Sequence, residues 1–364
     1  MKRVVTGNEA AAYGAVLARA QAIGCYPITP QTLIVEKLAE LVAGRDDVEF
    51  TNLESEHSMF GYVIGAARAG VRTFTATSSQ GLLYAHEQLH RASRERIPLV
   101  AVNVNRAIFA PWSIEPDLSD SMAQRDTGWV QLYASTAQEA LDDVICAYRI
   151  AERCLLPVLV CAEGFIVSHT SEVVDVPSQD EVDAFLPPLD PPQEWLLDPR
   201  HPAVFSALPD SADYFGFQRH LADAVDGARA VIDEVAAAFA AHFDRPKTGA
   251  VEVTGDHAAP DALVVIGSIG DTAQELLGER LRIVRVHAYR PFPFAQVEAA
   301  LDGATRIVAV DRAPAFGSLG PLGADVRAVA PEAANVICGL GGAEVTPDTL
   351  RWALEQHDIA WAVA

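Results

Sequence analysis

The sequence predicts an α/β protein in which two parallel-sheet units are joined by a proline-rich connector. Short runs of Val, Ile and Leu alternate with helical stretches over residues 1–165, and the same alternation returns over residues 259–364. This alternation is typical of parallel strands whose sheet is covered by helices on both faces. Between the two units, eight of the 22 prolines fall within residues 177–209. We therefore expect domains at 1–170 and 259–364, separated by a connector and an amphipathic helix over 171–258.

The first unit begins with a helix in "GNEAAAYGAVLARAQAIG", for which we expect Asn8 as the N-cap and Gly24 as the end. A later helix starts in "STAQEALDDVICAYRIAERC", where Ser135 and Gln138 have the spacing of a capping box. Helices lie between most of the strands, as parallel pairing requires. Strand-like runs are expected near 24–26, 48–53, 72–77, 97–105, 130–134 and 155–161.

The connector combines prolines with Trp195 and Phe205, so we expect it to be extended and to lie against other protein surface. The one-sided helix over residues 218–243 would be about 39 Å long at 1.5 Å per residue. Its apolar positions follow steps of four and three: Leu221, Val225, Ala228, Ile232, Val235 and Phe239. Packing on its own domain and contact with another subunit are both open roles for this helix. The last unit has four strand-like runs, "DALVVIGS", "LRIVRVHAY", "TRIVAVDR" and "NVICG".

Composition limits the classes of partner. The formal net charge of −22 argues against a nucleic acid, because phosphate contacts need an excess of Lys and Arg. The start of the chain turns polar too soon for a signal peptide, and no apolar run has the length of a membrane span. The cysteines form no CxxC pair, which favours buried, reduced thiols in a cytoplasmic protein and excludes a four-cysteine iron–sulfur cluster held by this chain alone. They are Cys25, Cys146, Cys154, Cys161 and Cys338.

Three polar residues come directly after predicted strands of the first unit: Thr29, Glu56 and Arg106. Because the carboxyl ends of parallel strands share one edge, these side chains should lie on one side of the sheet. Each also has an ordinary structural interpretation. Thr29 followed by Pro30 is a common helix start, Glu56 suits the first turn of a helix, and Arg106 could simply be exposed. Together they suit the binding of a small carboxylate.

A series of motifs in order along the chain resembles one family. The motifs are "YPITPQT", "ESEHS", "TFTATSSQGL", "NRAIFAPWSIEPDLSDSMAQRDTGWVQLYA", "CAEGFIVSHT", "YRPFP", "VDRAPAFG" and "GLGGAEVTP". They are similar to the α subunit of pyruvate:ferredoxin oxidoreductase, within the thiamine-diphosphate-dependent 2-oxoacid:acceptor oxidoreductases. The resemblance implies a pyrimidine-binding domain followed by a transketolase C-terminal-like domain. It also implies oxidative decarboxylation of a 2-oxoacid, pyruvate by default, with coenzyme A, giving acyl-CoA, CO₂ and reduced ferredoxin.

The resemblance also implies partner subunits. The family grips the diphosphate and Mg²⁺ with a GDG…N motif, which this sequence lacks. We therefore expect a β subunit that holds the diphosphate and Mg²⁺, together with γ and iron–sulfur δ subunits with 4Fe–4S clusters. Ferredoxin or a similar low-potential carrier would accept the electrons.

Residue roles follow from the matched motifs. The family's catalytic glutamate, which hydrogen-bonds N1′ of the aminopyrimidine, corresponds to Glu56, whereas Glu54 should point elsewhere. Arg106 corresponds to the substrate-side arginine with a catalytic role, and Thr29 to the threonine that contacts the substrate carboxylate. Pro27 is expected beside the cofactor and, with Pro30, should hold the Thr29 hydroxyl still.

The segment "DLSDSMAQRDTGW" is another family marker. We expect Asp117, Asp120, Arg125 and Asp126 to form an ion-paired loop that shapes the pocket rather than to take part in chemistry. Trp112, which follows Arg106 in "FAPWSIEP", would tune the pocket if it faces inward.

Two other functions are compatible with parts of this pattern. The small subunit of a pyruvate dehydrogenase-type decarboxylase has the same two domains and delivers its acyl group to lipoamide; "YPITP" and "RDTGW" argue against it. A non-catalytic scaffold subunit is the second alternative, and the presence of Thr29, Glu56 and Arg106 argues against that one.

Overall fold

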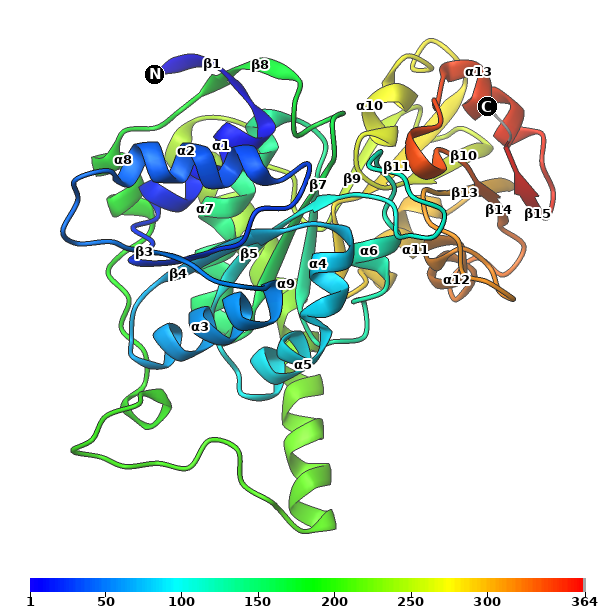
Figure 1. Cartoon of the computed structure of the whole chain (residues 1–364). Coiled ribbons are helices and arrows are strands. Elements are labelled where there is room, and N and C mark those ends of the chain that lie inside the picture. The colour runs from blue at the N-terminus through cyan, green and yellow to red at the C-terminus, as the bar shows by residue number, and fades with distance from the viewer. Residues whose placement is uncertain (363–364) are drawn as a thin grey trace.

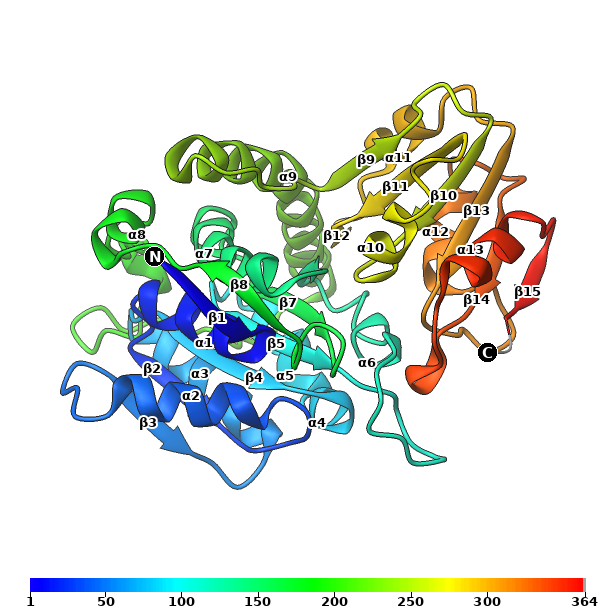
Figure 2. The same cartoon turned by 90° about the horizontal axis from the view of Figure 1, so that it is seen from above.

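Two separate sheets organise the chain and confirm the predicted α/β class. The computed structural model describes residues 1–362, with the two units side by side and the connector running along the first (Figures 1 and 2). Both sheets are mostly parallel, because helices connect nearly all consecutive strands.

The first sheet has seven strands in the spatial order β12, β6, β7, β5, β4, β2, β3. All its neighbours pair in parallel except β12, which comes from the second half of the chain and runs antiparallel to β6. The bounds are β2 Ala22–Cys25, β3 Glu49–Asn52, β4 Thr73–Thr77, β5 Val100–Asn105, β6 Val130–Ala134, β7 Val158–Glu163 and β12 Ala288–Arg290. The six strand runs expected from residues 1–165 are all present.

Helices cover both faces of this sheet. Alternate residues of β5 point into two different cores: Val100, Val102 and Val104 pack with α1, α2 and α7, whereas Ala101 packs with α3, α4 and α5. This double burial explains why residues 97–102, which lead into and start the strand, form an unbroken apolar run. The helices are α1 Gly7–Leu17, α2 Thr32–Val42, α3 Glu56–Arg68, α4 Ser79–Tyr84, α5 His86–Arg94, α6 Ser119–Met122 and α7 Ala137–Cys154.

Two predicted helix ends were wrong. α1 begins after Thr6, which forms a capping box with Glu9, so Asn8 lies inside the first turn. Asn8 is buried instead, and its amide donates to the Pro30 carbonyl oxygen over 2.9 Å. Gly24 does not end this helix, because it lies within β2.

The capping box predicted for Ser135 and Gln138 is not formed, and the N-cap lies one residue later. Thr136 is the N-cap of α7, and its hydroxyl accepts from the backbone N–H of Glu139. Ser135 still takes part, since its N–H and hydroxyl both donate to the Glu139 carboxylate.

The second sheet has six strands in the order β15, β14, β13, β10, β11, β9. β9 precedes residue 259 and pairs antiparallel with β11, while the other neighbours are parallel. The strands are β9 Val251–Gly255, β10 Asp261–Val265, β11 Leu281–Val286, β13 Arg306–Asp311, β14 Ala334–Ile337 and β15 Ile359–Trp361. The helices are α10 Ile269–Gln274, α11 Phe294–Leu301, α12 Pro321–Arg327 and α13 Pro347–Leu354, with a 3₁₀ turn, η2, at Leu340–Gly342.

The connector contains local structure that the sequence analysis did not anticipate. β8 (Ser171–Asp175) pairs antiparallel with β1 (Lys2–Thr6) in a small separate sheet. α8 (Gln179–Phe185) and a 3₁₀ turn, η1 (Gln193–Trp195), follow before the long helix α9 (Ser211–Phe243). From Leu221 onward α9 packs on the first unit, with Ala228, Ile232, Val235 and Phe239 buried. This part of the helix therefore has the intramolecular role.

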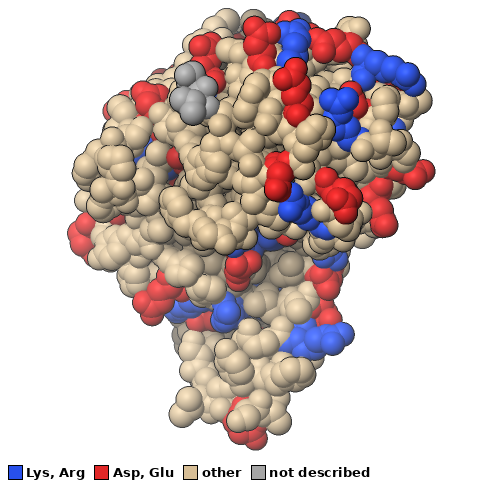
Figure 3. All heavy atoms as spheres, turned by 90° about the vertical axis from the view of Figure 1, so that its right-hand side faces the viewer, with Lys and Arg blue, Asp and Glu red and all other residues tan. Residues whose placement is uncertain are grey.

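Three further features concern the surface charges, the composition of the helices and the state of the cysteines. Figure 3 shows a face of the second unit on which acidic and basic side chains are interspersed without a continuous basic patch. Within residues 1–362, no helix combines the length and apolar composition that a bilayer span requires. The five cysteines are free thiols; four are buried and Cys154 is partly exposed.

A buried ion pair joins the two units. Glu163 ends β7 of the first sheet, and Arg312 follows β13 of the second. Their side chains are 1% and 3% exposed, with Arg312 Nη1 2.7 Å from Glu163 Oε2. The Ser268 hydroxyl also donates to Glu163, and Arg312 Nε donates to the Gly339 carbonyl oxygen. Every charged group at this junction thus has a partner from the opposite unit or from its own.

We expect Arg312→Met to destabilise the chain by about 3–5 kcal/mol, because it leaves a buried carboxylate without its counter-ion. The double variant Glu163→Gln, Arg312→Met should recover much of that loss. Arg351, in exposed pairs with Glu279 and Asp348, is the matched control; Arg351→Met should change stability far less, because solvent screens exposed ion pairs. Urea unfolding measures all three, and equal losses for Arg312→Met and Arg351→Met would contradict the interpretation.

Candidate active site

The candidate site lies at the carboxyl edge of four neighbouring parallel strands. β3, β2, β4 and β5 are adjacent in that order, so the loops that follow them meet at one edge. Thr29 follows β2, Glu56 follows β3, Gln80 follows β4 and Arg106 follows β5. The structure therefore brings the three residues singled out in the sequence to one side, together with Gln80, which was not among them.

Arg106 is fixed by two of these loops. Its Nη1 donates to the Thr29 carbonyl oxygen over 2.8 Å, and its Nη2 donates to Gln80 Oε1 over 3.1 Å. The residue is only 4% exposed, and burial lowers the pKa of its guanidinium. Its Nε has no hydrogen-bond partner among the described residues. A buried cation with donors to spare is a suitable partner for a small anion.

Thr29 does not have the helix-start role that Thr29 followed by Pro30 would ordinarily indicate. α2 begins at Thr32 with Gln31 as its N-cap position, so Thr29 does not cap this helix. Thr29 is exposed, as is Pro27, whereas Pro30 is buried. The contact of Thr29 with Arg106 is made by its carbonyl oxygen, which leaves the hydroxyl outside that interaction.

Glu56 is the first residue of α3, after the N-cap Ser55. It is 6% exposed, and burial raises the pKa of its carboxyl. A Cβ placed on Gly81 would lie 2.4 Å from Glu56 Oε1, so the carboxylate rests against a position where only glycine fits. Within residues 1–362 no side chain donates a hydrogen bond to it. Glu54, by contrast, is exposed and accepts from the Ser58 hydroxyl, which agrees with the expectation that it points elsewhere.

Asp120 holds the loops of the site together. Its fully buried carboxylate accepts from the backbone N–H of Ser79 over 2.9 Å and of Arg106 over 3.1 Å. The side-chain amides of Asn103 and Asn105 donate to it as well, over 2.9 and 2.7 Å. Burial raises the pKa of this carboxyl to about 6, although these four hydrogen bonds oppose the shift. Asp120 thereby fixes the start of α4 relative to the end of β5.

The expected ion-paired loop is wrong for Asp117 and Asp120, which are held by hydrogen bonds from backbone and amide groups. Asp117 accepts from the backbone N–H of Ser119 over 2.9 Å and of Gly341 in the second unit over 3.4 Å. Arg125 and Asp126 form a surface pair 3.9 Å apart. The loop reaches its shape because backbone N–H groups converge on two buried carboxylates. Trp112 is 71% exposed, with its ring 5.7 Å from the Arg106 guanidinium carbon.

Two sequence signals could have revealed the missed residues. The strand "IPLVAVNVN" has Asn103 and Asn105 two positions apart, hence on one face of a buried strand, which indicates a shared polar partner. The segment "TATSSQGL" has polar residues directly after a strand, as do the segments with Thr29, Glu56 and Arg106. Applying the strand-end rule to every strand would have added Gln80 and Gly81.

The residues present fit one half of a thiamine diphosphate site. A buried carboxyl with a raised pKa, no side-chain partner and a glycine beside it can bond a ring nitrogen of an aminopyrimidine. Residues 1–362 contain no group of His, Cys, Asp and Glu arranged to hold a metal ion. The fit is that of Glu56 to the pyrimidine ring.

The fold places the chain in a broad class before any closer relative is considered. A solved split-gene transketolase, an inactive β4 tetramer, aligns with 97% of this chain and 98% of its own, with a TM-score of 0.56 and 13% identity. 2-Oxoglutarate:ferredoxin oxidoreductase from Magnetococcus marinus aligns with 97% of this chain at a TM-score of 0.76 and 18% identity. This chain spans 65% of that one. The chain thus shares its fold with these two structures.

Sequence relatives define the family. Residues 13–237 match the family described as pyruvate flavodoxin/ferredoxin oxidoreductase, thiamine diphosphate-binding, and residues 261–350 match pyruvate:ferredoxin oxidoreductase core domain II. Ketoisovalerate oxidoreductase subunit VorA of Pyrococcus horikoshii is 40% identical over 95% of this chain and 91% of its own length. Pyruvate synthase subunit PorA of Methanothermobacter thermautotrophicus is 40% identical over 95% and 92%. The chain belongs to the pyruvate flavodoxin/ferredoxin oxidoreductase family, as the motifs indicated.

The ionised carboxylate of Glu56 should lower the free energy of unfolding at neutral pH. Because its pKa is higher in the folded chain than the ordinary value of 4.5, the stabilisation it gives is complete below that value and is lost as pH rises through the folded pKa. We expect Glu56→Gln to gain stability relative to the native chain between pH 4 and pH 7. Thermal unfolding across this range measures the difference.

Glu54→Gln is the matched control, with the opposite sign. The Ser58 hydroxyl lowers the pKa of Glu54, so its stabilisation is present above the ordinary pKa and is lost as pH falls. The stability of Glu54→Gln relative to the native chain should therefore fall slightly as pH rises. If the stability of the two variants, relative to the native chain, changed with pH in the same direction, the raised pKa assigned to Glu56 would be wrong.

Proposed function

We propose that this chain is the α subunit of a 2-oxoacid:ferredoxin oxidoreductase. The complete enzyme would oxidatively decarboxylate a 2-oxoacid, pyruvate by default, with coenzyme A, and would form acyl-CoA, CO₂ and reduced ferredoxin. The observation that supports this best is the buried carboxyl of Glu56, to which no side chain within residues 1–362 donates, on the same sheet edge as the Arg106 guanidinium. The 40% identity to pyruvate synthase and ketoisovalerate oxidoreductase subunits supports the substrate class.

Thiamine diphosphate, when bound, would supply a nucleophilic carbon for the keto group and a cationic ring able to take up the electron pair that departing CO₂ leaves behind. Glu56 would hold the pyrimidine ring through N1′ and keep a proton at that nitrogen, a task for which a raised pKa is suited. Gly81 leaves room for the ring to approach the carboxyl, and Pro27, exposed in this chain, would lie against the cofactor. Burial of Glu56 excludes water from the proton it holds.

Arg106 would bind the carboxylate of the oxoacid. Its guanidinium is already oriented by Thr29 and Gln80, so little side-chain freedom remains to be lost on binding. Thr29, whose carbonyl oxygen accepts from Arg106, would add its exposed hydroxyl as a donor to the same anion. In this position Arg106 would also favour negative charge that develops on the substrate oxygen.

The rest of the enzyme would come from other subunits. The chain has no GDG…N motif, so a β subunit would hold the diphosphate and Mg²⁺, and γ and δ subunits would complete the assembly with 4Fe–4S clusters. We propose a cytoplasmic location. A lipoamide-dependent decarboxylase subunit and a non-catalytic scaffold remain the alternatives; co-purification with cluster-containing subunits or with a lipoyl carrier separates the first from our proposal.

Glu56→Gln should lower kcat of the reconstituted enzyme by roughly 10²–10⁴-fold, the usual loss for a general acid–base group. Gly81→Ala should cost about 10²-fold, because its Cβ would push the same carboxyl out of place. Gly65→Ala on the same helix as Glu56 is the control, since its Cβ would meet no atom within 4 Å. An unchanged rate in Glu56→Gln would remove this residue from catalysis.

Arg106→Ala should raise KM for the oxoacid roughly 10- to 100-fold, the value of a charge-assisted hydrogen bond, with kcat lowered no more than KM is raised. Reduction of a viologen dye by the complete enzyme, with a panel of 2-oxoacids, gives both constants and identifies the preferred substrate. Arg45, paired with Asp47 on the surface, provides the control Arg45→Ala. If Arg106→Ala changed thermal stability alone, the arginine would be structural.

A further inference from the structure

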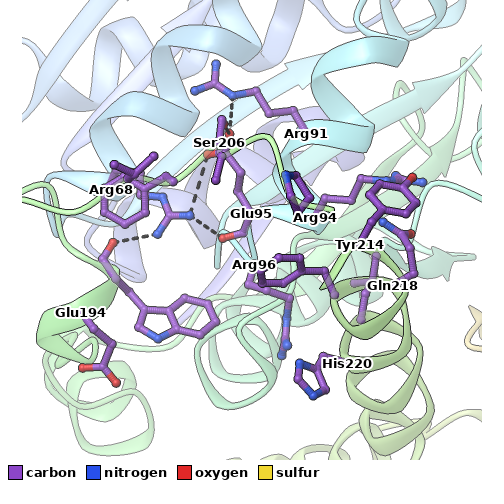
Figure 4. A pocket seen from close by; sticks show the side chains of 17 residues that line it. Arg68, Arg91, Arg94, Glu95, Arg96, Glu194, Ser206, Tyr214, Gln218 and His220 are labelled. Atoms are coloured by element: carbon purple, nitrogen blue, oxygen red, sulfur yellow. Dashed lines mark hydrogen bonds and ion pairs between the residues drawn. The ribbon is translucent and has the colours of Figure 1, made fainter. Parts of the chain in front are cut away.

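A groove lies at the far end of α5 from the candidate site. α4 begins at the carboxyl edge of the sheet, and α5 ends just before β5 starts, at the opposite edge. The groove has a volume of about 590 Å³. Figure 4 shows it between Arg91 and Arg94 of α5, the connector around Glu194, and Tyr214 with Gln218 on α9.

One wall of the groove belongs to a projecting arm, defined here as residues 196–220. In Figure 1 this part of the connector and the first turns of α9 extend away from the first unit. Six of its large apolar side chains have more than half of their surface exposed to solvent. The exposed fractions are Leu197 63%, Val204 81%, Leu208 100%, Tyr214 54%, Phe215 73% and Phe217 60%. Apolar side chains gathered on a projecting segment mark a contact surface for another protein.

The exposed surface of α4 and α5 connects the candidate site to this groove. Tyr84, Glu87, Arg91 and Arg94 are exposed and have the spacing of a single helical face. At the site end, the Tyr84 ring lies 6.0 Å from the ring of His57, the neighbour of Glu56. A partner that covers Glu56 therefore has a continuous surface to follow as far as the arm.

The groove is locally basic in a chain of net charge −22. Arg68 and Arg96 are engaged with main-chain oxygens, of Trp195 at 2.9 Å and of Leu155 at 3.0 Å. Arg91, with 48% of its side chain exposed, and Arg94 face outward, although Arg91 Nε also bonds Glu95. Arginines beside aromatic rings are the residues that contribute most to protein interfaces. Their natural complement is a carboxylate flanked by apolar side chains.

We infer that the arm and groove dock the subunit that supplies the diphosphate half of the site, which inserts an acidic segment with apolar neighbours. This inference rests on the proposed function, because the continuity argument needs a partner at Glu56. One subunit would then cover the candidate site, follow the α4–α5 face and be gripped by the arm. The arm would fix the register in which two half-sites meet.

Site-directed photo-crosslinking in the complete enzyme tests this. A photoreactive amino acid in place of Phe217 should crosslink to the subunit that contains the diphosphate-binding motif, as identified by mass spectrometry. The same probe in place of Phe316, 92% exposed on the second unit, is the control and should give little of that product. A crosslink to a second copy of this chain, to a different subunit, or in no greater yield than from position 316 would overturn the inference.

The variant Arg94→Glu, Tyr214→Ser provides an independent measurement. It should weaken association with that subunit at least about tenfold while the free chain keeps its thermal stability. Phe316→Ser should leave association unchanged. Equal association of the double variant and the native chain would overturn the docking surface. The proposed function fails differently: the native complex would then lack oxoacid-dependent dye reduction even though the crosslink forms.

Discussion

The buried carboxylate of Asp120 is the constraint on which the candidate site depends. It lies between two strand ends and accepts hydrogen bonds from the loop after β4, from Asn103 and Asn105 of β5, and from Arg106 directly after β5. A charged acceptor in a dry interior is costly unless every lone pair is used. Satisfying it forces Ser79 and Arg106 into fixed positions. Gln80 and Gly81 follow directly, so the partner of Arg106 and the space beside Glu56 are set by one interaction.

The site also shows where function opposes stability. Within residues 1–362, no side chain donates a hydrogen bond to the buried Glu56 carboxyl, and Arg106 Nε has no hydrogen-bond partner. A core selected only for folding would pair or replace both groups. The ion pair of Glu163 with Arg312 differs from the site in this respect, because each of these two charged side chains has a partner within the chain. The functional proposal therefore rests on the hydrogen-bonding capacity that the Glu56 carboxyl and the Arg106 guanidinium leave unused at one edge of the sheet.

The sequence predicted the layers and most strands because continuous Val and Ile runs are constrained by burial on both faces. It located Thr29, Glu56 and Arg106 because strand ends converge in any parallel sheet. It failed where competing local partners decided the outcome: Thr6 with Glu9 displaced Asn8 as the cap, and Thr136 displaced Ser135. It also missed β12 and the β1–β8 pair, since pairing between distant short segments leaves no periodic signal. Asp120 was noticed, but two of its partners are the backbone N–H groups of Ser79 and Arg106, which no sequence pattern displays.

The central claim is that this chain contributes half of a cofactor site, with Glu56 as the residue that bonds the pyrimidine. A structure of the assembled enzyme with thiamine diphosphate tests it most directly. The account predicts a Glu56 carboxylate oxygen within about 2.6–3.2 Å of N1′, with the diphosphate held by another subunit. A pyrimidine ring bound elsewhere, or a diphosphate held entirely by this chain, would contradict it.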